Sequence, residues 1–489
     1  MRNARFSYTS LTKQAFVFIS LVAASGLALS EEIDTPPWDV SAPNYSAEVQ
    51  EIDLNVTEGT WMNLDVSPDG QHIVFDLLGD IYQIPITGGE ATALLSGHAW
   101  EVQPQYSPDG RFLAFTSDRN GADNIWVMDL ADPGNKHQIT HESFRLLNNP
   151  SWHPSGEYLV AKKHFTTSRS LGTGELWLYD ANVAHALERE NLQGSVVVKR
   201  PSPAFQKELG EPTFSADGKS VFYIQNTTPG NTFIYHEDSN GEVMAIKRYD
   251  LETGEIEKVV GGAGGAVRPT PSPDGKTLAF VKRVRAASRL FVMDLASGEQ
   301  TMLVNDLDPD MQETWAVQGA YPTMAWTPDG DSIIYWSQGH IWRVDVASGE
   351  SRQIPFSVND TRTAYPAVEV AVDVAPDTLT TAMPRFAAQS PDGQSVVFES
   401  MGRLYVKRNS EEARLLTRDN AAAVEFSPAF SPDGKEVYYL TWSDEDLGSV
   451  RKVSARGGRS KNVLATPGHY VDLSISSDGE TLLFAKLSG

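Results

Sequence analysis

Short apolar runs alternate along most of the chain with one recurring polar turn. A tetrapeptide close to Ser-Pro-Asp-Gly occurs nine times, beginning at Ser67, Ser107, His153, Ser215, Ser272, Thr327, Ser390, Ser431 and Ser476. Its residues suit a tight turn, because Ser bonds locally, Pro presets φ, Asp tolerates the bridge region and Gly supplies a positive φ. The run after the turn, such as residues 112–115 or 278–281, is rich in β-branched and aromatic residues. The pattern therefore predicts two strands joined by each turn.

Most units continue into a third and a fourth strand. A third run, such as residues 125–129 or 341–345, ends in an acidic residue, and a fourth stretch, such as residues 91–95, closes the unit. Each unit therefore has the pattern of a four-stranded antiparallel meander. The copies lie 40 to 63 residues apart, and the shorter spacings match the ~40 to 45 residues of a propeller blade.

The predicted fold class is all-β, a β-propeller of four-stranded antiparallel blades with nine repeat motifs and an incomplete last blade. A parallel α/β domain is excluded because its crossover helices are missing. A β-sandwich is the alternative, but nine similar units favour radial repetition. A closed ring holds about four to eight blades, so nine motifs overfill one. We expect a break near residues 356–380, with six units in residues 31–355 and three in residues 356–489.

The end of the chain points to an unfinished blade. After the ninth turn only residues 480–486 remain as an apolar run, so the ninth blade would hold about two of four strands. We expect on this ground that the chain is not a complete protein, because the open edge of such a blade invites association. The alternative is a ring closed by pairing an amino-terminal strand, residues 47–56, with a late strand.

The charge balance narrows the range of partners. The 489 residues carry 40 Lys and Arg against 64 Asp and Glu, a net charge of −24. Nucleic acid is not expected as a partner, because so acidic a surface repels a polyanion. The absence of cysteine excludes disulfides, thiolate nucleophiles and Cys-ligated zinc.

Residues 1–30 have the pattern of a secretory signal peptide. Arg2, Arg5 and Lys13 form a positive region, and residues 15–29 are largely apolar. The apolar stretch is shorter than the ~20 residues of a membrane-spanning helix, so we expect cleavage rather than anchoring. The expected location is periplasmic or secreted, with no membrane span after cleavage.

The recurring turn, its following strand and the third strand at residues 125–129 together resemble the TolB-like, or PD40-repeat, class of β-propeller. Longer strings are similar to the amino-terminal propeller region of large exported amidohydrolases: residues 58–61, 75–80, 163–165, 169–175, 268–275, 310–315 and 467–470. The resemblance covers residues 38–489. In that family a metal-dependent barrel hydrolase follows the propeller, and we expect that domain to be absent from this chain.

A search for catalytic motifs returns little. The His-x-His metal motif of the amidohydrolases and the Gly-x-Ser-x-Gly elbow of serine hydrolases do not occur. His137 and His141 lie on one predicted strand, about 13 Å apart, which is too far for a zinc pair. The sequence favours an inter-blade loop over a dinucleotide loop at residues 261–265, and a solvated loop over a calcium site at residues 305–310. We expect no catalytic residue, metal or cofactor in this chain.

Residues 162–175 stand out as a basic loop in an acidic protein. Lys163, His164, Arg169 and Glu175 are candidate ligand or interface residues there, because His and Arg contact anionic or carbonyl groups. The simpler alternative is a surface ion pair between Arg169 and Glu175 that ties the loop down.

Arg268 and Glu313 are further candidates, since both lie at predicted strand edges or loops and are expected on the same face. Glu58, Trp61 and Trp315 have similar positions. Core packing is an equal explanation for the two tryptophans.

The expected function is an exported, non-catalytic β-propeller module that gates substrates for a metal-dependent amidohydrolase, or otherwise accompanies it. The resemblance implies a hydrolase domain as partner and an amide or peptide-like substrate. One alternative is a periplasmic TolB-like protein-interaction module that binds envelope proteins, although residues 31–60 are too few for the small α/β domain of TolB. A third is the propeller of an exported serine peptidase. The substrate, the number of blades per ring and the oligomeric state stay open.

Overall fold

The computed structural model describes residues 49–168, 171–183, 194–238, 240–364, 373–418 and 423–487. Within these ranges the chain forms 36 strands and no α-helix, and hence no helix that could span a membrane. The predicted all-β class is confirmed, and the repeated four-stranded antiparallel sheets are those of a β-propeller. Two strand-rich regions, residues 50–364 and residues 385–487, are described separately.

Six four-stranded sheets make up the first region, and we number them as blades in chain order. Blades one to three are β2 (Leu64–Val66), β3 (His72–Leu77), β4 (Asp80–Pro85) and β6 (Thr92–Leu95); β7 (Glu101–Tyr106), β8 (Phe112–Ser117), β9 (Asn124–Asp129) and β10 (Asp132–Gln138); and β11 (Leu147–Trp152), β12 (Tyr158–Thr166), β13 (Gly172–Asp180) and β14 (Ser195–Val198). Blades four to six are β15 (Leu209–Phe214), β16 (Ser220–Asn226), β17 (Met244–Asp250) and β18 (Ile256–Val260); β19 (Val267–Pro271), β20 (Thr277–Val284), β21 (Ala287–Asp294) and β22 (Gln300–Val304); and β23 (Ala325–Trp326), β24 (Ser332–Ser337), β25 (His340–Asp345) and β26 (Ser351–Ile354).

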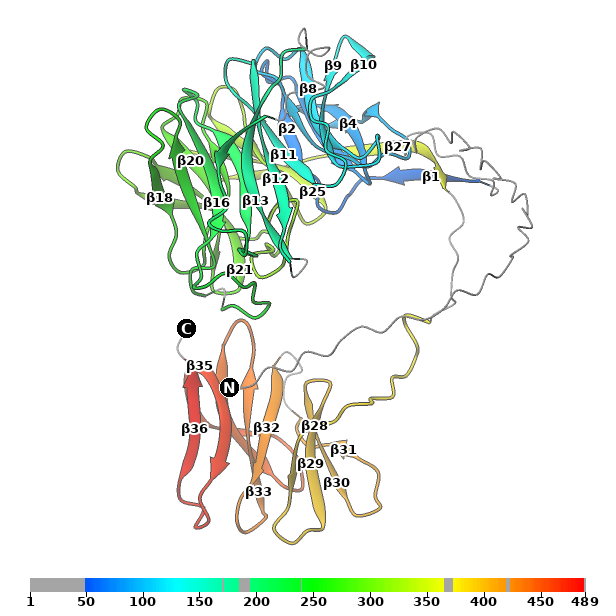
Figure 1. Cartoon of the computed structure of the whole chain (residues 1–489). Coiled ribbons are helices and arrows are strands. Elements are labelled where there is room, and N and C mark those ends of the chain that lie inside the picture. The colour runs from blue at the N-terminus through cyan, green and yellow to red at the C-terminus, as the bar shows by residue number, and fades with distance from the viewer. Residues whose placement is uncertain are drawn as a thin grey trace, which may run out of the picture. The chain divides into compact units, whose positions relative to one another are not determined.

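The six blades close into a ring, in which first strands of neighbouring blades contact one another (Figure 1). Thr323, directly before β23, donates its backbone N–H to Asn63 Oδ1 at 3.1 Å, and its Oγ1 accepts the N–H of Leu64 at 2.8 Å. Trp336 Nε1 donates to the carbonyl of Gly59 at 2.7 Å. These bonds join blade six to blade one. We call blades one to six the ring.

Each of the nine tetrapeptides joins the first two strands of its unit, as predicted. The glycine N–H donates to the carbonyl of the first residue at 2.8–2.9 Å in all nine copies. In eight copies the Ser or Thr hydroxyl donates to the Asp carboxylate. The glycine φ lies between 66° and 76°, a region that a residue with a Cβ rarely adopts.

Apolar side chains fill the space between neighbouring blades, and the two-residue period of each strand decides which neighbour they meet. On β12, Leu159 packs in a cluster with Ile125 of blade two. The next residue, Val160, packs in a cluster with Val221 of blade four. Adjacent residues of one strand therefore belong to different inter-blade cores.

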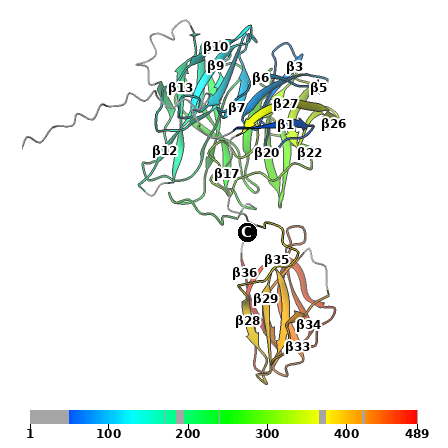
Figure 2. The same ribbon diagram turned by 90° about the vertical axis from the view of Figure 1, so that its right-hand side faces the viewer.

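An additional three-stranded sheet binds the two ends of the ring together, and we call it the latch. In it β1 (Gln50–Val56) pairs antiparallel with β27 (Phe356–Ala364), and β27 pairs parallel with β5 (Gly89–Glu90) (Figure 2). An amino-terminal strand thus pairs with a late strand, as in the closure considered above, but outside the blades. β27 follows the boundary expected at residue 355 and pairs with strands of the first region.

The second region contains two sheets, which we call the second sheet pair. They are β28 (Arg385–Gln389), β29 (Ser395–Ser400), β30 (Arg403–Arg408) and β31 (Arg414–Leu415); and β32 (Val424–Phe430), β33 (Glu436–Trp442), β34 (Gly448–Ser454), β35 (Lys461–Ile475) and β36 (Leu482–Leu487). The ninth tetrapeptide joins β35 to β36, and the first half of β35 pairs with β34. Within the described residues, the ninth unit therefore has two strands, as its sequence predicts.

Candidate functional site

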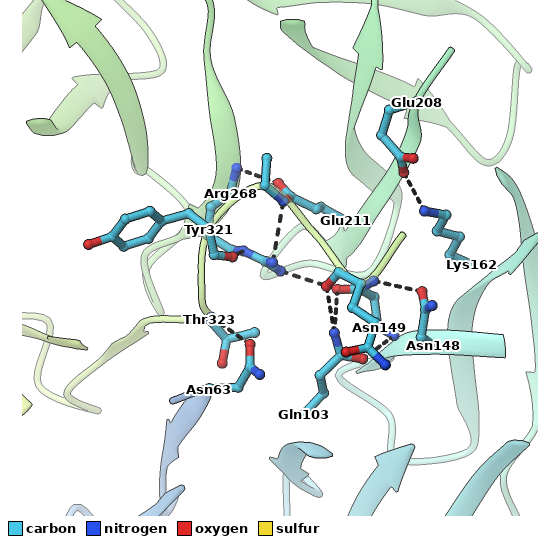
Figure 3. Close-up of polar contacts among 12 residues, drawn as sticks. Asn63, Gln103, Asn148, Asn149, Lys162, Glu208, Glu211, Arg268, Tyr321 and Thr323 are labelled. Carbon is cyan, nitrogen blue, oxygen red and sulfur yellow. Dashed lines mark hydrogen bonds and ion pairs between the residues drawn. The ribbon is translucent and has the colours of Figure 1, made fainter. Parts of the chain in front are cut away.

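The residue four positions before each tetrapeptide occupies the same level of the first strand in every blade of the ring. We call these six residues the channel residues, because they meet at the centre of the ring (Figure 3): Asn63, Gln103, Asn149, Glu211, Arg268 and Thr323. All six are polar, and the first five are at least 94% buried. Buried polar side chains need partners, so their contacts define what the centre of the ring can bind.

A backbone bulge places four of the channel residues. Gln103, Asn149, Glu211 and Arg268 have φ values of 50° to 59°, and the strand register shifts at each of them. Each is followed by proline. Bulges re-aim side chains, and a positive φ is uncommon for residues other than glycine. The repeat thus maintains an unfavourable backbone conformation where side chains turn into the channel.

Two amide side chains bridge blades two and three. Gln103 Oε1 accepts the backbone N–H of Asn149 at 2.7 Å, and Gln103 Nε2 donates to Asn149 Oδ1 at 3.2 Å. Asn149 Nδ2 donates to Asn148 Oδ1 at 2.8 Å. The amides hold one another in fixed orientations, which is the arrangement needed to present donors and acceptors to a ligand.

A buried ion pair faces these amides from blades four and five (Figure 3). Arg268 Nη2 lies 3.3 Å from Glu211 Oε1, and Glu211 Oε2 accepts the backbone N–H of Arg268 at 2.5 Å. Burial lowers the pKa of Arg268, and the carboxylate of Glu211 opposes this shift. Removing one partner of such a pair costs about 3–5 kcal/mol, because the other charge stays buried without compensation.

Two buried carboxyl groups tie blade one to blade two. Asp76 accepts N–H groups from Asn63 and Gln103 at 2.7–2.8 Å, and burial raises its pKa to about 6 against these bonds. Asp65 accepts the backbone N–H groups of Val66 and Tyr106 at 2.8–2.9 Å, while burial raises its pKa to about 7. Both oxygens of Asp65 are thus engaged by the backbone, so its carboxyl group joins blades rather than acting as a free general base.

A cavity of about 470 Å³ lies between the channel residues and the tetrapeptide turns, and we call it the funnel. Its wall carries Asp65, Gln105, Ser151, Thr213 and Thr270, each two residues before a tetrapeptide, with Trp152, Phe214 and Trp326 beside them. The volume lies within the ~300–1,000 Å³ typical of small-ligand sites. Hydroxyl and amide groups in the wall and an ion pair at its base suit ligands that carry both hydrogen-bond donors and acceptors.

The predicted basic loop at residues 162–175 is a hairpin instead, since β12 and β13 continue through most of it and only residues 167–171 connect them. Lys163 and Glu175 are register partners across the hairpin. Lys163 forms an ion pair with Glu142, and Glu175 lies 3.5 Å from Arg200. The apolar alternation of residues 158–161 extends into the basic residues, which a reading based on charge alone misses.

His164 and Lys163 lie on opposite faces of β12, because successive strand residues alternate. His164 is 97% buried, and its ring lies edge-on to Trp315 with 5.4 Å between the ring centroids. Neither ring nitrogen has a hydrogen-bond partner among the described residues. Burial, together with Lys162 and two arginines nearby, lowers the pKa of His164 to about 3. The imidazole is therefore neutral at physiological pH.

The other predicted site residues are spread over the ring. Arg268 lies in the channel, whereas Glu313 forms an ion pair with Arg283 in the segment before blade six. Arg169 lies outside the described residues. The hairpin pair and Arg268 thus occupy different parts of the ring, and whether any predicted residue binds a ligand stays a prediction.

Glu58 is exposed beside Gly339, and Trp61 packs against Tyr321 and Trp336 with ring centroids 5.9 and 6.1 Å apart. Core packing therefore accounts for Trp61. Trp315 donates its Nε1 proton to the carbonyl of Gly172 at 3.3 Å.

Sequence reasoning missed Gln103, Asn149 and Glu211. The signal was present, because each precedes a proline and stands four residues before a tetrapeptide, as Arg268 does. Aligning the nine copies on the turn would have placed these residues in one layer.

The acidic stretch at residues 305–310 bonds to protein groups: Asp308 accepts the backbone N–H of Gln338 at 2.5 Å, and Asp310 lies 2.8 Å from Arg283. Across the described ranges, no group of three His, Asp or Glu side chains is placed to hold a metal ion.

Comparison with known proteins supports a TolB-like PD40 propeller. Residues 49–181 match the family described as "PD40: TolB beta propeller domain". Tricorn protease homolog 1 of Streptomyces coelicolor is 23% identical over 438 residues, which cover 86% of this chain and 36% of that protein. The Tol-Pal system protein TolB of Francisella tularensis subsp. holarctica is 24% identical over 292 residues, 58% of each chain. The chain therefore spans only part of the length of these relatives.

Among solved structures, TolB from Acinetobacter baumannii is similar with a TM-score of 0.44 and 16% identity, covering 62% of this chain and 66% of that one. The chain is thus related to TolB and to the propellers of tricorn-like proteases at the level of sequence. The finer resemblance to exported amidohydrolases stays a prediction.

Proposed function

We propose that the ring is a recognition module that takes a peptide-like or amide-bearing ligand into the funnel. In this proposal the ring serves a hydrolase, first of all a metal-dependent amidohydrolase, and leaves the chemical step to that partner. The funnel carries the proposal, because its wall and base combine amide, hydroxyl and ion-pair groups around about 470 Å³. Export to the periplasm or beyond, after removal of residues 1–30, belongs to the same proposal.

The charge of the funnel base favours neutral ligands over ions. Glu211 and Arg268 compensate each other, and Gln103 and Asn149 are neutral. An amide offers one N–H donor and one carbonyl acceptor, and both find counterparts on Gln105, Ser151 or Thr213 in the wall. Selection by the ring would then depend on how many such pairs a ligand makes, independently of the partner's catalytic chemistry.

A second candidate function is a protein-interaction module that binds an extended segment of an envelope protein. The alignment with the Tol-Pal system protein TolB over 58% of the chain favours it. The tricorn-related similarity favours a third, the propeller of a peptidase. All three share recognition of peptide groups by the ring and differ in what acts on the bound segment.

Calorimetric titration with capped peptides of two to six residues tests the proposal. Gln105 lines the funnel, and its side chain makes no hydrogen bond within the described part of the chain, so Gln105→Ala changes the wall at little cost in stability. We expect this change to weaken binding about five-fold, the effect of one hydrogen bond. Gln353→Ala, an exposed glutamine on β26, is the matched control and should leave binding unchanged.

The same titrations separate the candidate functions. A hydrolase accessory should bind capped dipeptides nearly as well as longer peptides, whereas an interaction module should gain affinity with each added residue. If no peptide or amide binds the folded protein, or if binding is insensitive to Gln105→Ala, the funnel is not the recognition site.

A further inference from the structure

A long segment between β22 and β23 crosses the centre of the ring, and we call residues 305–323 the plug. It leaves blade five and enters blade six, yet its hydrogen-bond partners come from blades two to five on the side of the ring away from the tetrapeptide turns. Its route is therefore across the channel rather than along the rim.

Side chains of four blades hold the main chain of the plug. Lys162 Nζ donates to the carbonyl of residue 317 at 2.6 Å, and Gln103 Nε2 donates to the carbonyl of residue 318 at 2.7 Å. Glu211 Oε1 accepts the N–H of residue 320 at 2.6 Å, and Arg268 Nε donates to the carbonyl of residue 321 at 2.7 Å. Three carbonyls and one N–H are bound without any reference to the side chains of the plug.

The two ends of the plug are anchored differently from its tip, residues 314–319. On one side Arg283 forms ion pairs with Asp310 and Glu313, and on the other Tyr321 is buried against Trp336. The tip inserts no aliphatic side chain of comparable size into the ring. Its exchange for another segment therefore leaves both anchors in place.

Buried polar atoms remain unsatisfied around the tip. Asn148 Nδ2, Glu208 Oε2 and both ring nitrogens of His164 lack hydrogen-bond partners within the described residues. Unpartnered buried groups of this kind are rare in proteins and call for an explanation. They give this end of the channel a larger hydrogen-bonding capacity than the tip uses.

From this geometry we infer that the end of the channel beneath the plug is a binding site for extended peptide backbone, with the plug tip as its occupant in cis. A peptide ligand binds here by displacing residues 314–319 and takes over the bonds of Lys162 and Gln103. The inference rests on the proposed recognition role but concerns the opposite end of the channel from the funnel. Because the partners contact main-chain groups, the site reads backbone rather than sequence.

A variant with residues 314–318 replaced by Gly-Ser-Gly tests the inference. The probe is a fluorescein-labelled peptide copy of residues 313–319, measured by anisotropy. We expect the variant to bind the probe at least about ten-fold more tightly than the unmodified chain, because no tip competes. A scrambled peptide of the same composition should bind within about three-fold of the copy, since the site contacts main-chain groups.

Added to the tip replacement, Gln103→Ala should weaken binding about five-fold, and Gln353→Ala should not change it. In the unmodified chain, saturating probe should speed hydrogen exchange of residues 314–319, and this measurement decides the matter if the replaced variant does not fold. No gain in affinity by a folded variant, a gain confined to the native order of residues, or unchanged exchange would each overturn the inference. Gln105→Ala acts only on the funnel, so failure there with success here rejects the proposed funnel ligand alone.

Discussion

In the ring, the residue four positions before each tetrapeptide is packed at the centre of the molecule, with Gln103 and Glu211 1% and 2% exposed. In the second sheet pair the same position holds Phe386, Ser427 and Asp472, and Phe386 is 51% exposed. The backbone is alike in both regions, with φ values of 49° to 57° in the second sheet pair. The turn and bulge are thus local properties of the repeat, whereas burial of the bulged side chain needs a closed ring.

This difference decides how much one repeat position contributes. A polar side chain in a closed ring is removed from water and depends on its partners, so losing a partner is costly. The same position at an open face keeps water as a partner. The four predictions below use the two regions as controls for each other.

The largest effect is expected at Arg268. Arg268→Ala leaves Glu211 buried without its cation and should lower the free energy of unfolding of the ring by about 4 kcal/mol. Ser427→Ala at the equivalent position of the second sheet pair should cost less than about 0.5 kcal/mol. Hydrogen exchange with mass spectrometry measures strands of the two regions separately in one experiment.

A double variant tests whether the ion pair is the cause. Adding Glu211→Gln to Arg268→Ala removes the uncompensated charge and should restore part of the lost stability. Equal losses at Arg268 and Ser427 would mean that ring closure does not control the energetics of this position.

The latch is the next test, because it exists only in the ring. Arg362 of β27 reaches the fully buried Asp80 of β4, with Nη2 to Oδ2 at 2.6 Å. Burial raises the pKa of Asp80 to about 7 even with this arginine present. Arg362→Ala should raise that pKa further and lower ring stability by about 2 kcal/mol at pH 8.

The pH dependence has a definite sign. A carboxyl group whose folded pKa is raised loses stability as the pH rises through that pKa, so the cost of Arg362→Ala should grow from pH 6 to pH 8. Arg352→Ala removes an exposed ion pair with Glu350 and is the control, with an expected cost below about 0.5 kcal/mol at both pH values. A cost that falls with pH would contradict the assignment.

The sequence predicts the blades well because their determinants are local. Proline, aspartate and glycine fix each turn within four residues, and the apolar run after it pairs by proximity. The channel depends on contacts between blades: Gln103 with Asn149, and Glu211 with Arg268, are separated by 46 and 57 residues. No local pattern encodes such pairs, although their shared offset from the turn marks the positions.

The basic stretch was misread for a related reason. Lys163 and His164 are neighbours in sequence but face different blades, so charge density along the chain does not measure proximity in space. The plug was invisible for the opposite reason, because its partners recognise main-chain atoms that every residue possesses.

Histidine next to tryptophan occurs in both regions and gives the third prediction. His164 is buried against Trp315 with a pKa lowered to about 3, whereas His469 lies exposed against Trp442 with 5.0 Å between the ring centroids. A histidine with a lowered pKa stabilises the fold above its unfolded value of about 6.5, and this contribution is lost as the pH falls toward the folded pKa.

The unmodified ring should therefore lose about 2 kcal/mol between pH 6.5 and pH 5 that His164→Phe does not lose, as measured by urea unfolding at each pH. His469→Phe is the matched change in the second sheet pair and should leave the pH dependence as it is. Parallel curves for His164→Phe and the unmodified chain would show that His164 takes up protons freely in the folded ring.

The smallest effect should be the same in both regions, because it concerns the turn alone. Gly330 in the ring has a φ of 76° and no atom within 4 Å of an added Cβ, and Gly393 in the second sheet pair has a φ of 68° and only Gln389 near it, at 3.6 Å. Alanine fits the space at both sites, so the cost comes from the left-handed backbone and should be about 1 kcal/mol each. Local exchange of β23–β24 and β28–β29 measures the two costs. If Gly330→Ala costs several times more than Gly393→Ala, ring closure reaches into the turns, and the division between local turn and cooperative channel fails at the position where it should hold best.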